Sequence, residues 1–288
     1  MLAHGAPESL NDIPAYLSYV RGGRAQSHEI IEEVTRRYAE IGGGSPLLQR
    51  TREQAQALET ALRIPVYFGM RNWHPFISET LARIQADGIE RLVALCLAPQ
   101  YSKMSVGFYF RRTQEAKEAL GYQGDITWTK SFHDHPGLIE AFYEKLAPLL
   151  PAGYVLFTAH SLPEKVLETR DLYDKEAKAT ARAVAERAGL EAWDFAYQSQ
   201  GMTAEPWLGP TVESCLDDLA HKGVKDVVIA PIGFVSDHVE ILYDVDIQFR
   251  SYARPLGITV RRPDSLNNSR TFIAALASVV REKIGNSG

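Results

Sequence analysis

Short apolar segments alternate with longer stretches of helical periodicity along nearly the whole chain, and this alternation limits the fold more than any other feature. Several of the segments are almost continuously apolar, which is typical of strands covered on both faces. The candidate strands are Pro65–Gly69, Arg91–Ala98, Ile126–Ser131, Tyr154–Thr158, Trp193–Tyr197, Asp226–Ala230 and Ile258–Arg262. Helix ends between them are marked by Ser27, Ser45-Pro46, Gly88, Gly121 and Gly223. The alternation predicts an α/β protein with parallel sheets built from strand–helix–strand units.

The two halves of the chain resemble each other weakly. Short tags recur in the same order in both halves, and each falls at the carboxyl end of an expected strand. The paired tags are Ala3-His4-Gly5-Ala6-Pro7 and Ala159-His160-Ser161-Leu162-Pro163, Gly69-Met70 and Gly201-Met202, and Leu97-Ala98-Pro99 and Ile229-Ala230-Pro231. Together they indicate two similar α/β lobes. Because ligands of such sheets bind beyond the carboxyl ends of the strands, we expect the site in a cleft between the lobes.

Composition excludes several classes of protein. The net charge of −5 argues against a nucleic-acid partner. The two cysteines, Cys96 and Cys215, lie far apart, which excludes a disulfide scaffold, a four-cysteine zinc site and an iron–sulfur cluster. The sequence contains no apolar run long enough to span a membrane and no visible signal peptide, so we expect a cytoplasmic protein. The first residues, Met1-Leu2-Ala3-His4, read as the end of a strand whose beginning is missing.

A histidine and a row of acidic residues are the strongest candidates for chemistry. His160 directly follows the fourth candidate strand, where it is either a functional imidazole facing the cleft or a histidine satisfied by hydrogen bonds. Asp237, Glu240 and Asp244 are spaced i, i+3, i+7, and Gln248 extends this row by one turn. Such a row is often a solvated helix face. Here apolar residues intervene, which favours crowded carboxylates that bind protons or a cation.

Three further motifs do not support their usual functions. Gly42-Gly43-Gly44-Ser45 lacks the Lys of a phosphate-binding loop and predicts a tight turn before a helix. His238-Val239-Glu240 is not followed by the cysteines of a zinc deaminase. His133-Asp134-His135 could bind a metal, but its position beside a proline favours a surface loop.

Several ordered blocks of the sequence resemble the ferrochelatases. The blocks are Tyr38–Leu47, Gly69–Arg71, Leu97–Ser102, Ala159–Pro163, Gln198–Gly201, Pro206–Pro210 and Pro231–Asp244. The resemblance implies a lyase that inserts Fe²⁺ into a porphyrin in heme biosynthesis. Arg21-Gly22-Gly23-Arg24 is most similar to the branch that converts coproporphyrin III to coproheme. The alternatives are a protoporphyrin IX ferrochelatase and a cobalt or nickel chelatase acting on another tetrapyrrole.

The same resemblance implies the architecture and the partners. It predicts two Rossmann-like lobes, each a parallel sheet flanked by helices, with a cleft between them. The first lobe would comprise residues 1–133 and 263–288, including a returning C-terminal helix, and the second residues 134–262. Fe²⁺ would be a substrate, and the reaction would require no cofactor and no iron–sulfur cluster. We expect a monomer without a membrane span, with the porphyrin as ligand and other heme-pathway enzymes as candidate partners.

By resemblance, particular residues acquire roles. His160 and Glu240 would be catalytic and would contact the metal, with Asp244 and Gln248 continuing the metal or proton path. His4 stands where relatives carry Tyr, as a candidate axial ligand to product iron, and distant cobalt and nickel chelatases also carry His-Gly there. Gln248 replaces the usual Glu, which weakens the idea of a metal path. The residues expected to bind the porphyrin are His4, Arg21, Arg37, Ser45, Tyr109 and Ser199.

Overall fold

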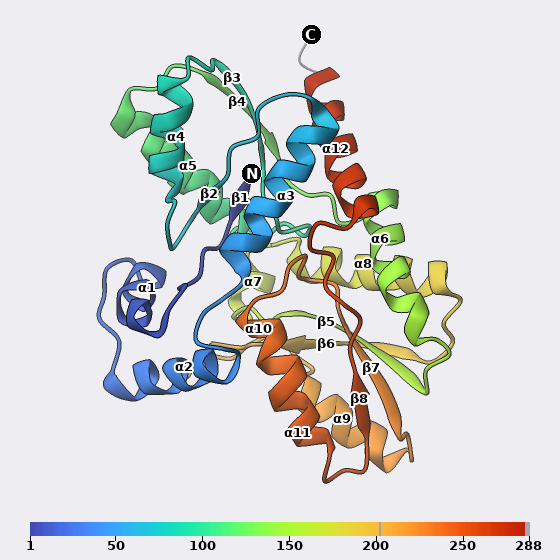
Figure 1. Cartoon of the computed structure of the whole chain (residues 1–288). Helices are drawn as coiled ribbons and strands as arrows, with labels where there is room; N and C mark the ends of the chain where they lie inside the picture. Colours follow the sequence, from blue (N-terminus) through green and yellow to red (C-terminus); the bar gives the residue numbers. More distant parts are fainter. Residues whose placement is uncertain (202, 286–288) are drawn as a thin grey trace.

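Two parallel sheets with the same strand order form the framework of the molecule (Figure 1), for which the computed structural model describes residues 1–201 and 203–285. In the first half β1 pairs with β2 and β3 with β4, and a parallel bridge from Leu2 to Cys96 joins the two pairs. In the second half the order is β6-β5-β7-β8. The strands are β1 (Leu2–Ala3), β2 (Gly69–Met70), β3 (Arg91–Leu95), β4 (Asp125–Thr129), β5 (Tyr154–His160), β6 (Trp193–Gln198), β7 (Asp226–Pro231) and β8 (Thr259–Arg261).

The structure therefore repeats the order β2-β1-β3-β4 as β6-β5-β7-β8, with all pairs parallel. The α/β fold with parallel sheets is confirmed. Six of the seven candidate strands match to within about two residues at their starts. Pro65–Gly69 does not, because the ladder begins only at Gly69, opposite the two-residue β1. Met202, in the second copy of the Gly-Met tag, lies outside the described residues.

The helices of the first half begin and end at the expected signals. Ser27 accepts a hydrogen bond from the N–H of Ile30 at 3.4 Å, and Ser45 accepts one from the N–H of Leu47 at 3.2 Å. Gly121 ends α5 in the left-handed conformation. The helices are α1 (Ile13–Val20), α2 (His28–Glu40), α3 (Leu47–Leu62), α4 (Ile77–Ala86) and α5 (Val106–Leu120).

The helices of the second half include one that returns to the first. The helix α12 packs against α3 and α6 and against the strands β3 and β4, and its buried face includes Phe272 and Leu276 (Figure 1). The residue limits predicted for the two lobes stay a prediction. The helices are α6 (Pro136–Leu146), α7 (Lys165–Glu168), α8 (Tyr173–Ala188), α9 (Val212–His221), α10 (Val239–Leu242), α11 (Arg250–Ala253) and α12 (Arg270–Gly285).

The acidic segment is not the regular α-helix that the spacing predicted. The helix α10 begins at Val239, and from Asp244 to Phe249 the chain forms a π-helix. Asp237 precedes the helix, and its Oδ2 accepts a hydrogen bond from the side-chain amide of Asn267 at 2.8 Å. The expectation that Asp237 shares a helical face with Glu240 is therefore wrong. Because π-helices occur mostly as short insertions within α-helices and are frequent at functional sites, the distortion makes this segment a candidate for function.

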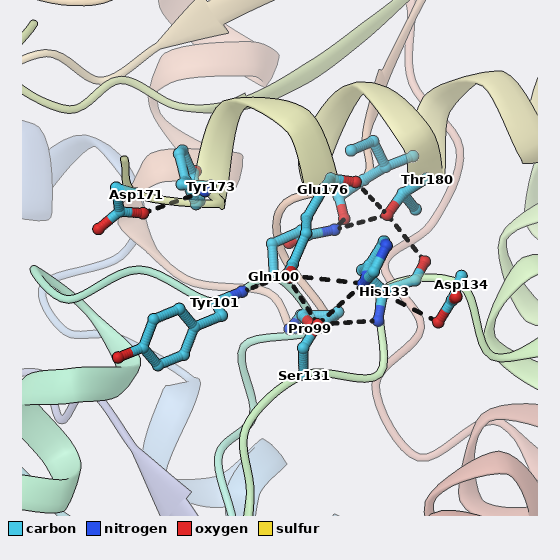
Figure 2. A network of polar contacts seen from close by, with 11 residues as sticks. Pro99, Gln100, Tyr101, Ser131, His133, Asp134, Asp171, Tyr173, Glu176 and Thr180 are labelled. Carbon is cyan, nitrogen blue, oxygen red and sulfur yellow. Dashed lines mark hydrogen bonds and ion pairs between the residues drawn. The ribbon is translucent and has the colours of Figure 1, made fainter. Parts of the chain in front are cut away.

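A network of polar contacts joins the ends of β3 and β4 to α8 (Figure 2). The buried carboxylate of Glu176 accepts hydrogen bonds from the backbone N–H of Tyr101 at 2.6 Å and from the hydroxyl of Ser131 at 2.7 Å. The side-chain amide of Gln100 donates to Thr180 Oγ1 at 3.1 Å and to the carbonyl of Ile232 at 3.2 Å. These bonds hold the two halves together beside the carboxyl ends of the strands.

The His133-Asp134-His135 segment contributes to this junction. His133 is half-buried, with its Nδ1 2.9 Å from Ser131 Oγ and 3.6 Å from Glu176 Oε2. His135 Nδ1 accepts from the N–H of Gly137 at 3.1 Å and caps α6. Only Asp134 is fully exposed. The interpretation as a surface loop therefore holds for one residue of the three, because the two imidazoles are used as hydrogen-bonding groups of the fold.

Candidate active site

A cavity of about 240 Å³ lies where the strands of both halves end. It is lined by aromatic and apolar side chains together with a few titratable groups, which is typical of a binding site for a small organic molecule. The lining side chains from the first half include His4, Tyr16, Tyr38, Arg71, Met104 and Tyr109, and those from the second half include His160, Tyr173, Phe234, His238 and Glu240.

Two imidazoles flank the carboxylate of Glu240. His160 is the last residue of β5, and its Nε2 lies 3.6 Å from Glu240 Oε1. His238 Nε2 lies 3.6 Å from the other oxygen, Oε2. Each ring directs its Nδ1 at a backbone carbonyl, that of Ser161 for His160 and that of Ser236 for His238. A carbonyl only accepts, so both Nδ1 atoms carry a proton, and the Nε2 atoms are the basic nitrogens that face Glu240.

The electrostatics of this group favour an ionised carboxylate. Burial by itself would raise the pKa of Glu240, but the neighbouring His160 and His238 outweigh it and lower this pKa to about 2. Burial likewise works against protonation of His238, yet interaction with Glu240 raises the pKa of that imidazole. The Glu240 side chain is surrounded by protein but keeps 30% of its surface open towards the cavity. A substrate in the cavity can therefore reach both the imidazole and the carboxylate.

His4 follows β1 and lines the same cavity. Its Nε2 lies 3.0 Å from the side-chain nitrogen of Asn72. Burial, and after it the positive charge of Arg71, lowers the pKa of His4 to about 3, so this ring is neutral at pH 7. His4 therefore differs from His238, which lies beside a carboxylate.

A second cavity, of about 510 Å³, is lined by Ser161 and Asp244. These residues follow His160 and Glu240 of the first cavity by one and four positions along the chain. Ser199 donates a hydrogen bond to Asp244. Burial, and then the charge of Glu240, raises the pKa of Asp244 to about 6. The side-chain amide of Gln248 donates to Glu213 at 3.3 Å, which places a carboxylate from α9 at the outer end of the row.

The structure separates the candidate site residues into three groups. His4, Tyr109, His160 and Glu240 line the first cavity, and Arg37, Ser199, Asp244 and Gln248 line the second. Arg21 is exposed and donates to Gln26, and Ser45 caps α3, so these two line neither cavity.

Sequence reasoning missed several residues of the first cavity. Arg71 ended a recognised block but received no role, and His238 was considered only within a deaminase motif. Three tyrosines also received no role: Tyr38 begins the recognised Tyr38–Leu47 block, and Tyr16 and Tyr173 lie outside the recognised blocks. Burial raises the pKa of each of these phenols, so they present neutral hydroxyls to the cavity.

Within residues 1–201 and 203–285, no group of three His, Cys, Asp or Glu side chains could hold a metal ion by itself. His160 and Glu240 offer one imidazole nitrogen and one carboxylate oxygen, which suit a divalent transition metal but do not complete its coordination. A metal at this position would need further ligands from a bound molecule.

Comparison with known proteins identifies that chemistry. The family model described as Ferrochelatase matches residues 1–284. The chain belongs to the ferrochelatase family. As a ferrochelatase it is a lyase that inserts a metal ion into a porphyrin in heme biosynthesis, and the porphyrin nitrogens supply the ligands that the protein lacks.

Curated relatives match all or nearly all of this ferrochelatase chain. A ferrochelatase of Acidobacterium capsulatum is 45% identical over 98% of this chain and 92% of its own length. One of Deinococcus radiodurans is 41% identical over 98% and 94%. A coproporphyrin III ferrochelatase of Geobacillus thermodenitrificans is 36% identical over 100% and 96%.

Solved structures share the fold of this ferrochelatase. SirB from Bacillus subtilis, solved with Fe³⁺, has a TM-score of 0.63 at 13% identity and covers 83% of this chain and 90% of its own. CbiX, from siroheme biosynthesis in denitrifying bacteria, has a TM-score of 0.59 at 13% identity and covers 98% and 96%. These likenesses confirm the chelatase-like architecture. Among the described helices, none has the length and hydropathy to span a membrane.

Proposed function

We propose that this ferrochelatase inserts Fe²⁺ into coproporphyrin III to give coproheme, with His160 and Glu240 as its catalytic pair. The observation that carries the proposal is the 3.6 Å approach of His160 Nε2 to Glu240 Oε1 in the wall of an aromatic cavity. Two features support the choice of coproporphyrin: the Arg21-Gly22-Gly23-Arg24 segment and the full-length similarity to enzymes named for this substrate.

The reaction requires a proton acceptor at the ring. A free porphyrin is flat and holds two N–H protons, so a pyrrole nitrogen must tilt out and lose its proton before the metal enters. His160 Nε2 accepts the first proton and passes it to solvent before it accepts the second, so both ring protons leave as Fe²⁺ enters. The anionic Glu240 stabilises the imidazolium formed each time. Distorting the ring costs about 1–5 kcal/mol, which contacts remote from the reacting nitrogens supply.

The remaining candidate residues act around this pair. His4 and Tyr109 line the first cavity and contact the porphyrin ring there. The other expected porphyrin-binding residues lie outside this cavity, so we assign them to the parts of the substrate that extend beyond it. Arg21 and Arg37 hold propionates, since a guanidinium binds a carboxylate through two hydrogen bonds, and Ser45 and Ser199 contact the edge of the ring. Asp244 and Gln248, with Glu213 beside them, form the path for metal or protons through the second cavity.

The reaction needs only its two substrates and a single copy of the chain. Fe²⁺ enters as substrate, and neither a cofactor nor an iron–sulfur cluster takes part. The enzyme acts as a monomer in the cytoplasm, where its partners are the porphyrin, Fe²⁺ and neighbouring heme-pathway enzymes.

Two alternatives differ in substrate. A protoporphyrin IX ferrochelatase needs to hold only two propionates, and a cobalt or nickel chelatase is favoured by His4 at the position where such enzymes carry His-Gly. An insertion assay with coproporphyrin III, protoporphyrin IX and sirohydrochlorin, each with Fe²⁺ or Co²⁺, separates the three. We expect the highest kcat/KM with Fe²⁺ and coproporphyrin III. A preference for sirohydrochlorin with Co²⁺ would sink the proposal.

The catalytic pair has its own test. His160→Ala removes the proton acceptor, so kcat should fall by about 10²–10⁴-fold while coproporphyrin III still binds, as measured by quenching of porphyrin fluorescence. His221→Ala, at an exposed position that ends α9, is the matched control and should leave kcat unchanged. Near-normal turnover of the His160 variant would refute the assignment.

A further inference from the structure

Asn72 lies against His4 through both its backbone and its side chain. The backbone N–H of Asn72 donates to the carbonyl of His4 at 2.9 Å, in line with the bond from Arg71 N–H to the Ala3 carbonyl at 3.0 Å. Its side-chain nitrogen, Nδ2, lies 3.0 Å from His4 Nε2. Asn72 is only 4% exposed and lies behind the residues that line the cavity. The Nε2 edge of His4 is therefore turned towards a buried amide.

Arg71 determines which way round this amide is bound. Its Nε lies 3.4 Å from Asn72 Oδ1, and a guanidinium only donates. If the amide were reversed, the NH₂ group of Asn72 would face the Arg71 donor. The oxygen therefore faces Arg71 and the NH₂ group faces His4. Because an NH₂ group only donates, His4 Nε2 accepts, and the proton of the neutral ring is on Nδ1.

We infer that Asn72 is a positioning residue that holds His4 as the Nδ1–H tautomer with its Nε2 lone pair occupied. In this state Nε2 is not free to coordinate a metal. Iron can gain His4 as an axial ligand only if the bond from Asn72 to Nε2 breaks.

This arrangement has a consequence for turnover, which rests on the proposed function. A free imidazole in the wall of the cavity would bind the iron of a newly formed metalloporphyrin and slow its release. Because Nε2 is bonded to Asn72, the product iron does not form this bond to His4, and the product is held less tightly on this side of the cavity.

The tautomer can be measured directly on the metal-free protein. Two-bond ¹H–¹⁵N correlation spectra of histidine-labelled protein distinguish a protonated from a bare ring nitrogen, and His4→Ala assigns the signals. We expect protonated Nδ1 and bare Nε2 in the wild type. In Asn72→Asp the carboxylate accepts instead, so the proton should move to Nε2. A bare Nδ1 or a doubly protonated ring in the wild type would overturn the inference, whatever the substrate of the enzyme proves to be.

Binding of iron coproporphyrin gives a second readout. When Asn72 is present, His4→Ala should give the same absorption spectrum of bound product as the wild type. Asn72→Leu removes the donor and frees Nε2, so its product spectrum should shift, and dissociation should slow by about tenfold or more. The double variant His4→Ala/Asn72→Leu should lose both effects. A His4-dependent spectrum in the wild type, or none in Asn72→Leu, would count against the role of Asn72.

Discussion

Two carboxylates four positions apart in the sequence have opposite properties in this enzyme. Glu240 lies between two imidazoles that lower its pKa to about 2. Asp244 has Ser199 as its hydrogen-bond donor and Glu240 nearby, and burial raises its pKa to about 6. The difference comes from neighbours contributed by other elements rather than from the acids themselves. Glu240 is thus a fixed negative charge, whereas Asp244 can exchange protons near neutral pH.

The raised pKa of Asp244 predicts a pH-dependent effect on stability. The folded protein binds this proton more tightly than the unfolded chain, whose carboxyl has a pKa of about 4. Ionised Asp244 therefore costs stability above about pH 6, and this cost disappears as the pH falls to about 4. Asp244→Asn should raise the free energy of unfolding by about 1–3 kcal/mol at pH 8 and by about half as much at pH 5.

Urea unfolding at pH 5 and pH 8 measures this difference. Asp218→Asn, at an exposed position on α9, is the control and should change stability little at either pH. A loss of stability at pH 8 in the Asp244 variant would show that its carboxylate is better compensated than the structure indicates.

At the scale of elements, the turn after β7 packs closely against the end of β5. Gly233 lies so close to β5 that a Cβ atom there would be 2.7 Å from Ala159 Cβ and 2.8 Å from Ala159 Cα. Its N–H also donates to the carbonyl of Thr158 at 3.1 Å. The turn therefore supports the backbone that presents His160. Glycine is required here for close approach, which explains its place in the Pro231–Asp244 block.

Gly233→Ala should consequently affect activity through the position of His160. The added methyl group meets backbone, which must shift, at a cost of about 1–3 kcal/mol in the free energy of unfolding. A displacement of the imidazole approaching 1 Å should lower kcat by about 10²-fold. Gly107→Ala is the matched control. Gly107 lies in α5, and the atom nearest to an added Cβ, the carbonyl oxygen of Ser102, would be 3.5 Å away, which is an ordinary contact. An unchanged kcat in a destabilised Gly233 variant would show that the turn does not position His160 for catalysis.

At the scale of the whole molecule, the cavity exists because the two halves are held in one orientation. Glu176 on α8 is central to the junction, because its carboxylate accepts from Tyr101 and Ser131 of the other half (Figure 2). Part of the Leu97–Ser102 block therefore serves the junction rather than the chemistry. Hydrogen bonds to a buried charged group are stronger than those between neutral groups, so this carboxylate contributes more than its size suggests.

Glu176→Gln should weaken the junction between the two halves without removing all of its hydrogen bonds. The amide retains one oxygen acceptor but loses the charge, and its NH₂ group faces a site built for an acceptor. We expect the free energy of unfolding to fall by about 1–3 kcal/mol in urea titrations. Glu186→Gln, an exposed position on the same helix, should leave stability unchanged. Equal stability of the two variants would mean that other contacts hold the halves together.

The sequence by itself determined the elements of this protein and its family. Strands such as β5 and β7 are continuous apolar runs, and helices such as α2 start at a local capping signal, so short stretches of chain contain the information for them. The ordered blocks that resemble ferrochelatases are likewise contiguous. The strand order was not predicted from the sequence, because the weak repeat of tags indicated only that the two halves are similar.

Only the tertiary structure decided which side chains meet. The π-helix and the exclusion of Asp237 from the acidic row depend on where the helix begins, which spacing alone did not reveal. Asn72 contacts His4 because β1 and β2 lie side by side in parallel register. Glu240 is ionised because His160 arrives from another strand. Charge, tautomer and access arise from contacts between distant residues, so they follow from the packing of the elements and not from any one segment.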